Sequence, residues 1–176
     1  MMNPIEEYVD QIETGKINAP KRIIKVYTSL LDDLRKGDKY YYDPDAAERV
    51  IHFTEKYCKQ SKVQFAGQSL KLCLFQKAKF AALYGTKRKE DDLRRFRECN
   101  DFRGRKNGKS VEQSALGLYH LIFDHEGGAE VYCVATKLDQ AKRVFDESVN
   151  MVHQSKALSM NLKKRKTDLY FAPRFS

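Results

Sequence analysis

Apolar side chains recur at three- and four-residue spacing in the first part of the chain, which predicts helices. One such stripe consists of Ile23, Tyr27, Leu30, Leu31 and Leu34. Asn3-Pro4 combines a capping side chain with a proline suited to the first helical turn, and Asp43-Pro44 opens a further helix that ends near Tyr57. We expect residues 1–68 to form a helical lead-in, with a seam at the Gly67-Gln68-Ser69 turn.

The pattern changes after residue 69, where helices are predicted to alternate with strands. Leu93–Phe102 is a weak strand candidate, because it is more polar than a buried parallel strand, whereas the apolar run Ala129–Ala135 is a clearer one. Helical spacing of apolar residues follows each of them, over 111–122 and 137–152. This order is typical of βαβ units. We therefore expect an α/β fold over 69–176, with a parallel sheet of the P-loop type flanked by helices.

Gly108-Lys109-Ser110 lies between the first predicted strand and the helix that follows it. In a phosphate-binding loop, glycine lets backbone amides wrap the phosphates, lysine reaches the β- and γ-phosphates, and a hydroxyl holds Mg²⁺. The phosphates lie at a helix N-terminus, where free amides and the helix dipole favour anions. The general pattern has its first glycine at position 103, where this chain has Arg103, with Gly104 one residue late. For the triplet alone, a surface loop that is basic by chance is the alternative.

Several further motifs occur in the order and spacing of one family. They are Arg105-Lys106-Asn107-Gly108-Lys109-Ser110, Gly128-Ala129-Glu130-Val131-Tyr132, Ala135-Thr136-Lys137, Asp139-Gln140-Ala141 and Val144-Phe145-Asp146-Glu147. Asn3-Pro4-Ile5, Tyr41-Tyr42-Asp43 and residues 72–85 fit the same order. Together these motifs resemble the large terminase subunit of tailed bacteriophages, and the resemblance covers nearly the whole chain.

The resemblance implies a motor ATPase that drives viral DNA into a preformed capsid, followed in longer relatives by a metal-dependent nuclease. The residues that match the family's deviant Walker A loop are Gly104, Arg105, Lys106, Asn107, Gly108, Lys109 and Ser110. The implied cofactors are ATP and Mg²⁺, with Lys109 on the phosphates, Ser110 on the metal and Arg105 acting as a sensor or finger in cis. A guanidinium near the γ-phosphate would stabilise the charge of the transition state. The alternative for Arg105 is a solvated loop residue.

Three residues outside the loop are candidates through the same resemblance. Leu74-Phe75-Gln76 resembles an adenine-recognising Q motif, in which the Gln76 amide can both donate to and accept from the base. An ordinary position on a helix surface is the alternative for Gln76. Thr136 and Gln140 match a loop that faces nucleic acid in related translocases, and helix N-capping by Thr136 is the alternative there.

The sequence does not supply the acidic residues that complete an ATPase site. Hydrolysis needs carboxylates that hold Mg²⁺ and orient water, normally after a later buried strand. Leu121-Ile122-Phe123-Asp124 imitates this pattern, but it follows the loop by a whole helix, about 20 Å at about 1.5 Å per residue. The family continues beyond residue 176 into its Walker B strand, coupling motif and nuclease. We therefore expect an incomplete sheet with an exposed edge, nucleotide binding and very weak hydrolysis.

The charge of the chain favours a polyanionic partner. The net charge is +9, and basic residues cluster at 87–89, 94–97 and 163–166. Double-stranded DNA is the expected partner, although such clusters are commonly solvated turns. The resemblance further implies a small terminase subunit, a portal protein and, at full length, a homo-oligomeric ring.

Apolar runs and cysteine spacing exclude other classes. No run approaches the roughly 20 apolar residues of a membrane span and no signal-peptide pattern occurs, so we expect no membrane association and a location in the bacterial cytoplasm. The four cysteines are widely spaced, so we expect reduced thiols and no metal site apart from the Mg²⁺ carried by nucleotide. They are Cys58, Cys73, Cys99 and Cys133.

Two functions from different classes follow from these observations. One is the ATPase portion of a DNA-packaging motor. The other is a non-catalytic basic module that binds DNA or a protein partner and keeps a relic phosphate loop. A generic helicase-like ATPase is a third, which the form of the loop disfavours.

Overall fold

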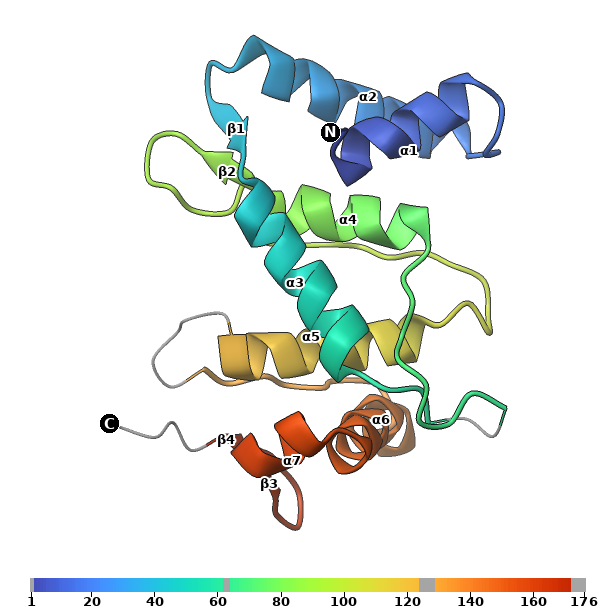
Figure 1. Cartoon of the computed structure of the whole chain (residues 1–176), viewed down its shortest axis with the longest axis vertical. Coiled ribbons are helices and arrows are strands. Elements are labelled where there is room, and N and C mark those ends of the chain that lie inside the picture. The colour runs from blue at the N-terminus through green and yellow to red at the C-terminus, as the bar shows by residue number, and fades with distance from the viewer. Residues whose placement is uncertain (1, 62–63, 124–128, 172–176) are drawn as a thin grey trace. The chain divides into compact units, whose positions relative to one another are not determined.

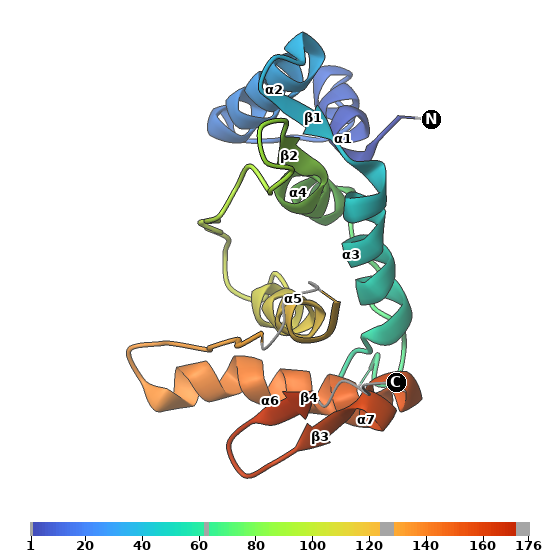
Figure 2. The same cartoon turned by 90° about the vertical axis from the view of Figure 1, so that its left-hand side faces the viewer.

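The computed structural model describes residues 2–61, 64–123 and 129–171. The chain divides into two compact units, each built from two segments. Unit 1 comprises Met1–His52 and Leu72–Asp101, and unit 2 comprises Phe53–Lys71 and Phe102–Ser176. Figure 1 and Figure 2 show the elements of both units, coloured by residue number from blue at the N-terminus to red at the C-terminus. Each unit combines residues from both sides of the expected boundary at residue 68, and that boundary stays a prediction.

Unit 1 is mainly helical. Its elements are α1 (Pro4–Glu13), α2 (Lys21–Lys36), β1 (Tyr40–Tyr42), the first part of α3 (Pro44–Tyr57), α4 (Leu74–Gly85) and β2 (Thr86–Arg88). The Asn3 side chain accepts from the amide of Glu6, and the Glu6 carboxylate accepts from the amide of Asn3, each at 3.0 Å. This reciprocal pair fixes the start of α1. The helix starts predicted at Asn3-Pro4 and Asp43-Pro44 are confirmed.

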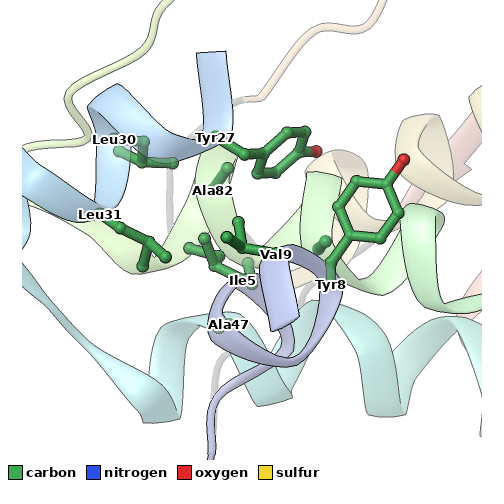
Figure 3. Packing of buried hydrophobic residues seen from close by; sticks show 10 residues of the cluster. Ile5, Tyr8, Val9, Tyr27, Leu30, Leu31, Ala47 and Ala82 are labelled. Carbon is green, nitrogen blue, oxygen red and sulfur yellow. The ribbon is translucent and has the colours of Figure 1, made fainter. Parts of the chain in front are cut away.

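The core of unit 1 forms where the apolar faces of α1, α2 and α4 meet (Figure 3). Ile5 and Val9 of α1 pack in one cluster with Leu30 and Leu31 of α2. The rings of Tyr8 and Tyr27 meet edge to face with their centroids 5.1 Å apart. Most of the predicted apolar stripe on α2 is therefore buried or partly buried, although Ile23 at its first turn is 37% exposed.

Unit 1 also contains a short antiparallel pair of strands, β1 and β2. Tyr42 pairs with Thr86, next to Gly85. A Cβ atom on Gly85 would stand 2.7 Å from the ring of Tyr42 and 2.9 Å from the Cβ of Ala47, so only glycine fits this position. The close approach lets the amide of Asp43 donate to the Gly85 carbonyl at 2.7 Å.

The strand predicted at Leu93–Phe102 is wrong. This segment forms a single bridge, between Lys87 and Arg94, and is otherwise irregular. The segment is more polar than a buried strand, and it pairs with β2 only near Arg94, where the Arg95 amide donates to the Thr86 carbonyl at 2.9 Å. The Arg95 guanidinium pairs with Asp33 at 2.6 Å and lies 3.9 Å from the centre of the Tyr40 ring.

Unit 2 is built around two packed helices, α5 (Lys109–Phe123) and α6 (Leu138–Gln154), and both predictions of a helix there are confirmed. The remaining elements are the end of α3, drawn in teal in Figure 2, and α7 (Lys156–Asn161), β3 (Leu162–Lys164) and β4 (Leu169–Phe171), which lie at the red end of its colour scale. The Ser114 hydroxyl of α5 donates to the Val144 carbonyl of α6 at 2.7 Å. The ring of Phe53 packs on the rings of Tyr119 and Phe123 of α5, with centroids 5.6 and 5.2 Å apart. Within the described parts of the chain, no helix is both long and apolar enough to cross a lipid bilayer.

The mixed α/β class is confirmed, but the parallel sheet is not. Both sheets among the described residues are two-stranded and antiparallel. Ala129–Ala135, the clearer strand candidate, has no strand assignment, and its Val134 side chain is 88% exposed. An apolar run supplies strand propensity, but a ladder also needs a neighbouring strand. Leu121-Ile122-Phe123-Asp124 was the segment that resembles a Walker B pattern. Leu121–Phe123 forms the end of α5, and Asp124 lies outside the described residues.

Candidate phosphate-binding loop

Residues 103–108 lead directly into the first turn of α5, as the phosphate-loop prediction requires. Gly108 has a φ of 70°, in the left-handed region that favours glycine. Lys106 has a φ of 64°, which costs a non-glycine residue about 1 kcal/mol. The first hydrogen bond of α5 runs from the Glu112 amide to the Gly108 carbonyl at 3.0 Å. The amides of Lys109, Ser110 and Val111 therefore lie at the positive end of the helix dipole.

Lys109 spans the loop from its last residue to its first. Its ammonium donates a hydrogen bond to the carbonyl of Arg103. Residues 104–108 and Ser110 are exposed, whereas Lys109 is half-buried. The residues of the turn are therefore open to solvent, and the Lys109 ammonium is bonded back to the residue that precedes them. A ligand with negative oxygens could replace the Arg103 carbonyl as the partner of this ammonium.

Arg103 and Glu112 are functional candidates that the sequence analysis missed. A guanidinium nitrogen of Arg103 lies 3.0 Å from the carboxylate of Glu112, and the Glu112 side chain is only 3% exposed. Arg103 also donates to the Asn107 carbonyl at 3.3 Å. The arginine at the position expected for glycine therefore ties both ends of the loop to the first turn of α5. The presence of Arg103 where the general phosphate-loop pattern has glycine was the feature of the sequence that could have pointed to this contact.

Gly104 and Arg105 occupy the start of the exposed turn. A Cβ on Gly104 would stand 3.4 Å from the Asn107 side chain, at the edge of ordinary contact, so this position tolerates a small side chain. Arg105 is exposed, one residue before the left-handed Lys106. The geometry places Arg105 on the solvent side of the loop, where both the finger role and the solvated alternative are open.

The charge of this segment favours anions. Residues 103–112 carry four cationic side chains and one carboxylate. Glu112 is buried against Arg103, which leaves Arg105, Lys106 and Lys109 to attract a polyanion. Among the described residues, no group of three or more His, Cys, Asp or Glu side chains is placed to hold a metal ion. Burial raises the pKa of the Cys58 thiol to about 12, which makes this cysteine a poor nucleophile or metal ligand.

Gln76 belongs to unit 1, whereas the loop belongs to unit 2. Its side-chain carbonyl accepts from the Cys73 amide at 2.9 Å, and Cys73 and Gln76 form a capping box at the start of α4. Gln76 is half-buried and makes this local contact at the start of α4. Its role in adenine recognition stays a prediction.

Thr136 and Gln140 lie at the start of α6, and both are exposed. The N-cap residue of α6 is Lys137, whose backbone is extended and whose carbonyl accepts from the Gln140 amide at 3.0 Å. The alternative of N-capping by Thr136 is wrong, because the helix begins one residue later than that role requires. Contact of Thr136 and Gln140 with nucleic acid stays a prediction.

Comparisons with known proteins agree on one family. A family model described as "Terminase large subunit, ATPase domain" matches residues 74–171, more than half of the chain and all of the loop. The crystal structure of the HK97 bacteriophage large terminase is similar with a TM-score of 0.52 and 26% sequence identity, over 72% of this chain. The match spans 25% of the HK97 protein. No curated protein matches the chain. The chain belongs to the family of terminase large subunit ATPase domains.

Proposed function

We propose that this chain binds ATP with Mg²⁺ at residues 104–110 and forms part of the motor that drives viral DNA into a capsid. The observation that carries the proposal is the passage from a left-handed glycine, Gly108, through Lys109 into the N-terminus of α5. This passage brings exposed loop backbone, an ammonium and a helix dipole to one place, which is the combination that a triphosphate requires.

Each loop residue takes a role that its chemistry permits. Lys109 would exchange the Arg103 carbonyl for phosphate oxygens, and Gly108 lets the backbone approach them closely. The Ser110 hydroxyl, an oxygen ligand at the first turn of α5, fits Mg²⁺. Arg105 would stabilise the charge that spreads over the γ-phosphate oxygens. Gln76 would bind the adenine base, and Lys106 and Asn107 complete the loop.

A bound magnesium ion would supply charge neutralisation at the phosphates. The match spans a quarter of the HK97 large terminase. We propose that the catalytic acids belong to a part of the terminase that this chain does not cover. The chain itself would bind ATP and hydrolyse it very weakly. In the full protein, Lys109 and Arg105 would be catalytic.

The parallel sheet forms part of the same proposal. Ala129–Ala135 would act as one of its strands once a neighbouring strand pairs with it, and an extended apolar segment supports this role. Further proposed partners are double-stranded DNA, the small terminase subunit and the portal protein, with a homo-oligomeric ring as the assembled form. Thr136 and Gln140 would face the DNA.

Thermal unfolding with and without Mg-ATP tests the proposal. A ligand that binds only the folded state stabilises it by about 2.7 kcal/mol at a hundredfold excess over its Kd. We expect ATP to raise the melting temperature of the wild type but not of Lys109→Ala. Lys142→Ala is the matched control, because Lys142 is an exposed lysine of α6 outside the loop. The control should respond to ATP as the wild type does.

The second candidate function is a non-catalytic DNA-binding or partner-binding module with a relic loop. The observation that favours it is the excess of cations, a net charge of +9. This function is established instead if Mg-ATP shifts neither the wild type nor Lys142→Ala. An equal shift in Lys109→Ala would also remove the loop from the nucleotide site.

A further inference from the structure

The β3–β4 hairpin of unit 2 has one face that packs and one that faces solvent. Lys163 pairs with Tyr170 and Lys164 with Leu169, and the amide of Arg165 donates to the Asp168 carbonyl at 2.9 Å. Side chains alternate across a strand, so Lys163, Arg165, Asp168 and Tyr170 share one face. All four are exposed. On the other face Leu162 is buried, and Leu169 and Phe171 are half-buried.

Arg165 is held in a fixed orientation on the solvent face. Its guanidinium carbon lies 4.1 Å from the centre of the Tyr170 ring, and a guanidinium nitrogen lies 3.7 Å from the carboxylate of Asp168. The Arg165 side chain is nevertheless 58% exposed. A guanidinium that is already oriented loses less freedom when its planar donors bind a phosphate.

The hairpin is strongly cationic. Lys163, Lys164, Arg165 and Lys166 are all exposed, and Asp168 is the one carboxylate among residues 162–171. Three positive charges therefore remain over a short stretch of surface, which favours a polyanion. Arg165 covers one face of the Tyr170 ring, so that face is not open to stack on an unpaired base. These features suit the phosphates of a duplex better than the bases of a single strand.

We propose that the β3–β4 hairpin is a contact surface for the phosphate backbone of double-stranded DNA. The inference shares its partner with the proposed function and extends it, but it needs neither the phosphate-binding loop nor ATP. Lys163, Arg165 and Lys166 supply the contacts. Binding at this surface is independent of sequence and weakens with salt, because each phosphate contact releases counterions.

Fluorescence anisotropy of a labelled duplex of about 30 base pairs, without nucleotide, tests the inference across a salt series. The test variant is Lys163→Ala/Arg165→Ala/Lys166→Ala. The matched control is Lys21→Ala/Arg22→Ala/Lys25→Ala, which removes the same charge from exposed positions of α2 in unit 1. We expect the hairpin variant to bind at least about tenfold more weakly and to lower the magnitude of the slope of log K against log salt by about 3, or about 0.9 for each lost phosphate contact. The control should change the slope by less than about 1.

Three outcomes would overturn the inference. They are equal losses in the two triple variants, no binding of the duplex by the wild type at low salt, and an unchanged salt slope in the hairpin variant. Circular dichroism checks the fold of each variant, and Lys163→Gln/Lys166→Gln replaces the triple variant if that one does not fold. The hairpin variant, tested by thermal unfolding with Mg-ATP, should show the same shift in melting temperature as the wild type. Loss of ATP binding and loss of DNA binding are thereby separated.

Discussion

Unit 1 and unit 2 differ in how far their side chains find partners within the unit. In and just after β2 of unit 1, Lys87 is ion-paired with Asp43 and Arg95 with Asp33. In unit 2, Arg105 and Lys106 of the loop and Lys163–Lys166 of the β3–β4 hairpin are exposed, although Arg103 is paired with the buried Glu112. These two clusters of unit 2 leave more positive charge open to solvent than the paired residues beside β2.

Apolar side chains show the same contrast. In the described part of unit 2, five large apolar side chains are each more than two-thirds exposed: Phe102, Tyr132, Val134, Leu138 and Met160. In unit 1, the most exposed large apolar side chain among those described is Val26, at 58%. Three of the five residues in unit 2 lie in or beside Ala129–Ala135, the segment that we propose as a strand of a larger sheet. Such a concentration of apolar surface is typical of a region that another part of a protein covers.

The largest expected effect comes from the buried ion pair of unit 2. Glu112→Gln leaves the Arg103 guanidinium without its carboxylate, and breaking a buried pair costs about 3 kcal/mol. Hydrogen exchange followed by mass spectrometry should show faster exchange in the peptides of unit 2. We expect the peptides of unit 1 to change less, because Arg103 and Glu112 both belong to unit 2.

A double variant sharpens this prediction. Arg103→Met/Glu112→Leu replaces both charges by apolar groups, which commonly restores stability. We expect it to recover most of the loss while still weakening the ATP-dependent shift, because Arg103 also holds the Asn107 carbonyl of the loop. The single variants Arg103→Met and Glu112→Leu complete the comparison. If the stability lost in the double variant equals the sum of the losses in the two single variants, the ion pair does not act as a unit.

Two glycines give the next largest contrast between the units. Gly85→Ala should destabilise unit 1 by about 2 kcal/mol, because the new Cβ would collide with Tyr42 and Ala47. Gly117→Ala should stabilise unit 2 by up to about 1 kcal/mol, because its Cβ has ordinary clearance, 3.6 Å from Val131, and alanine favours helices. Urea unfolding of each variant, read by pulse-labelled hydrogen exchange, measures both. Similar effects at the two sites would contradict the close approach of Gly85.

The smallest expected effect is the pH dependence of unit 1. Burial raises the pKa of Asp43, but hydrogen bonds from Lys87 and from the Ala46 amide outweigh it and leave the pKa below its ordinary value of 3.8. A carboxyl with a lowered pKa in the folded state stabilises the protein above the unfolded pKa. That contribution is lost as the pH falls below about 3.8 through the folded pKa.

Asp43→Asn tests the source of this dependence. Its free energy of unfolding should fall less between pH 5 and pH 3 than that of the wild type. The difference should be below about 1 kcal/mol, because the Asp43–Lys87 pair is near the surface. Each protein is equilibrated in urea at each pH and then labelled by a pulse of hydrogen exchange at one fixed pH. The exchange of peptides from unit 1 gives the unfolding of that unit. An identical loss in both proteins would assign the dependence to other carboxyls.

The sequence by itself determined the features that depend on neighbours along the chain. Caps and prolines located the starts of α1 and α3, apolar spacing located α5 and α6, and Gly108-Lys109-Ser110 located the loop ahead of α5. These features could be predicted because the hydrogen bonds of helices and caps join residues three or four positions apart.

Only the tertiary structure decided the features that depend on distant partners. Arg95 pairs with Asp33 and lies over the ring of Tyr40, and Gly85 lies against Tyr42 and Ala47. The apolar run Ala129–Ala135 has strand propensity, but no described strand pairs with it. The role of Arg103 likewise appeared only when Glu112 was seen to be buried against it. Local sequence sets what a segment prefers, and its partners in space decide what it forms.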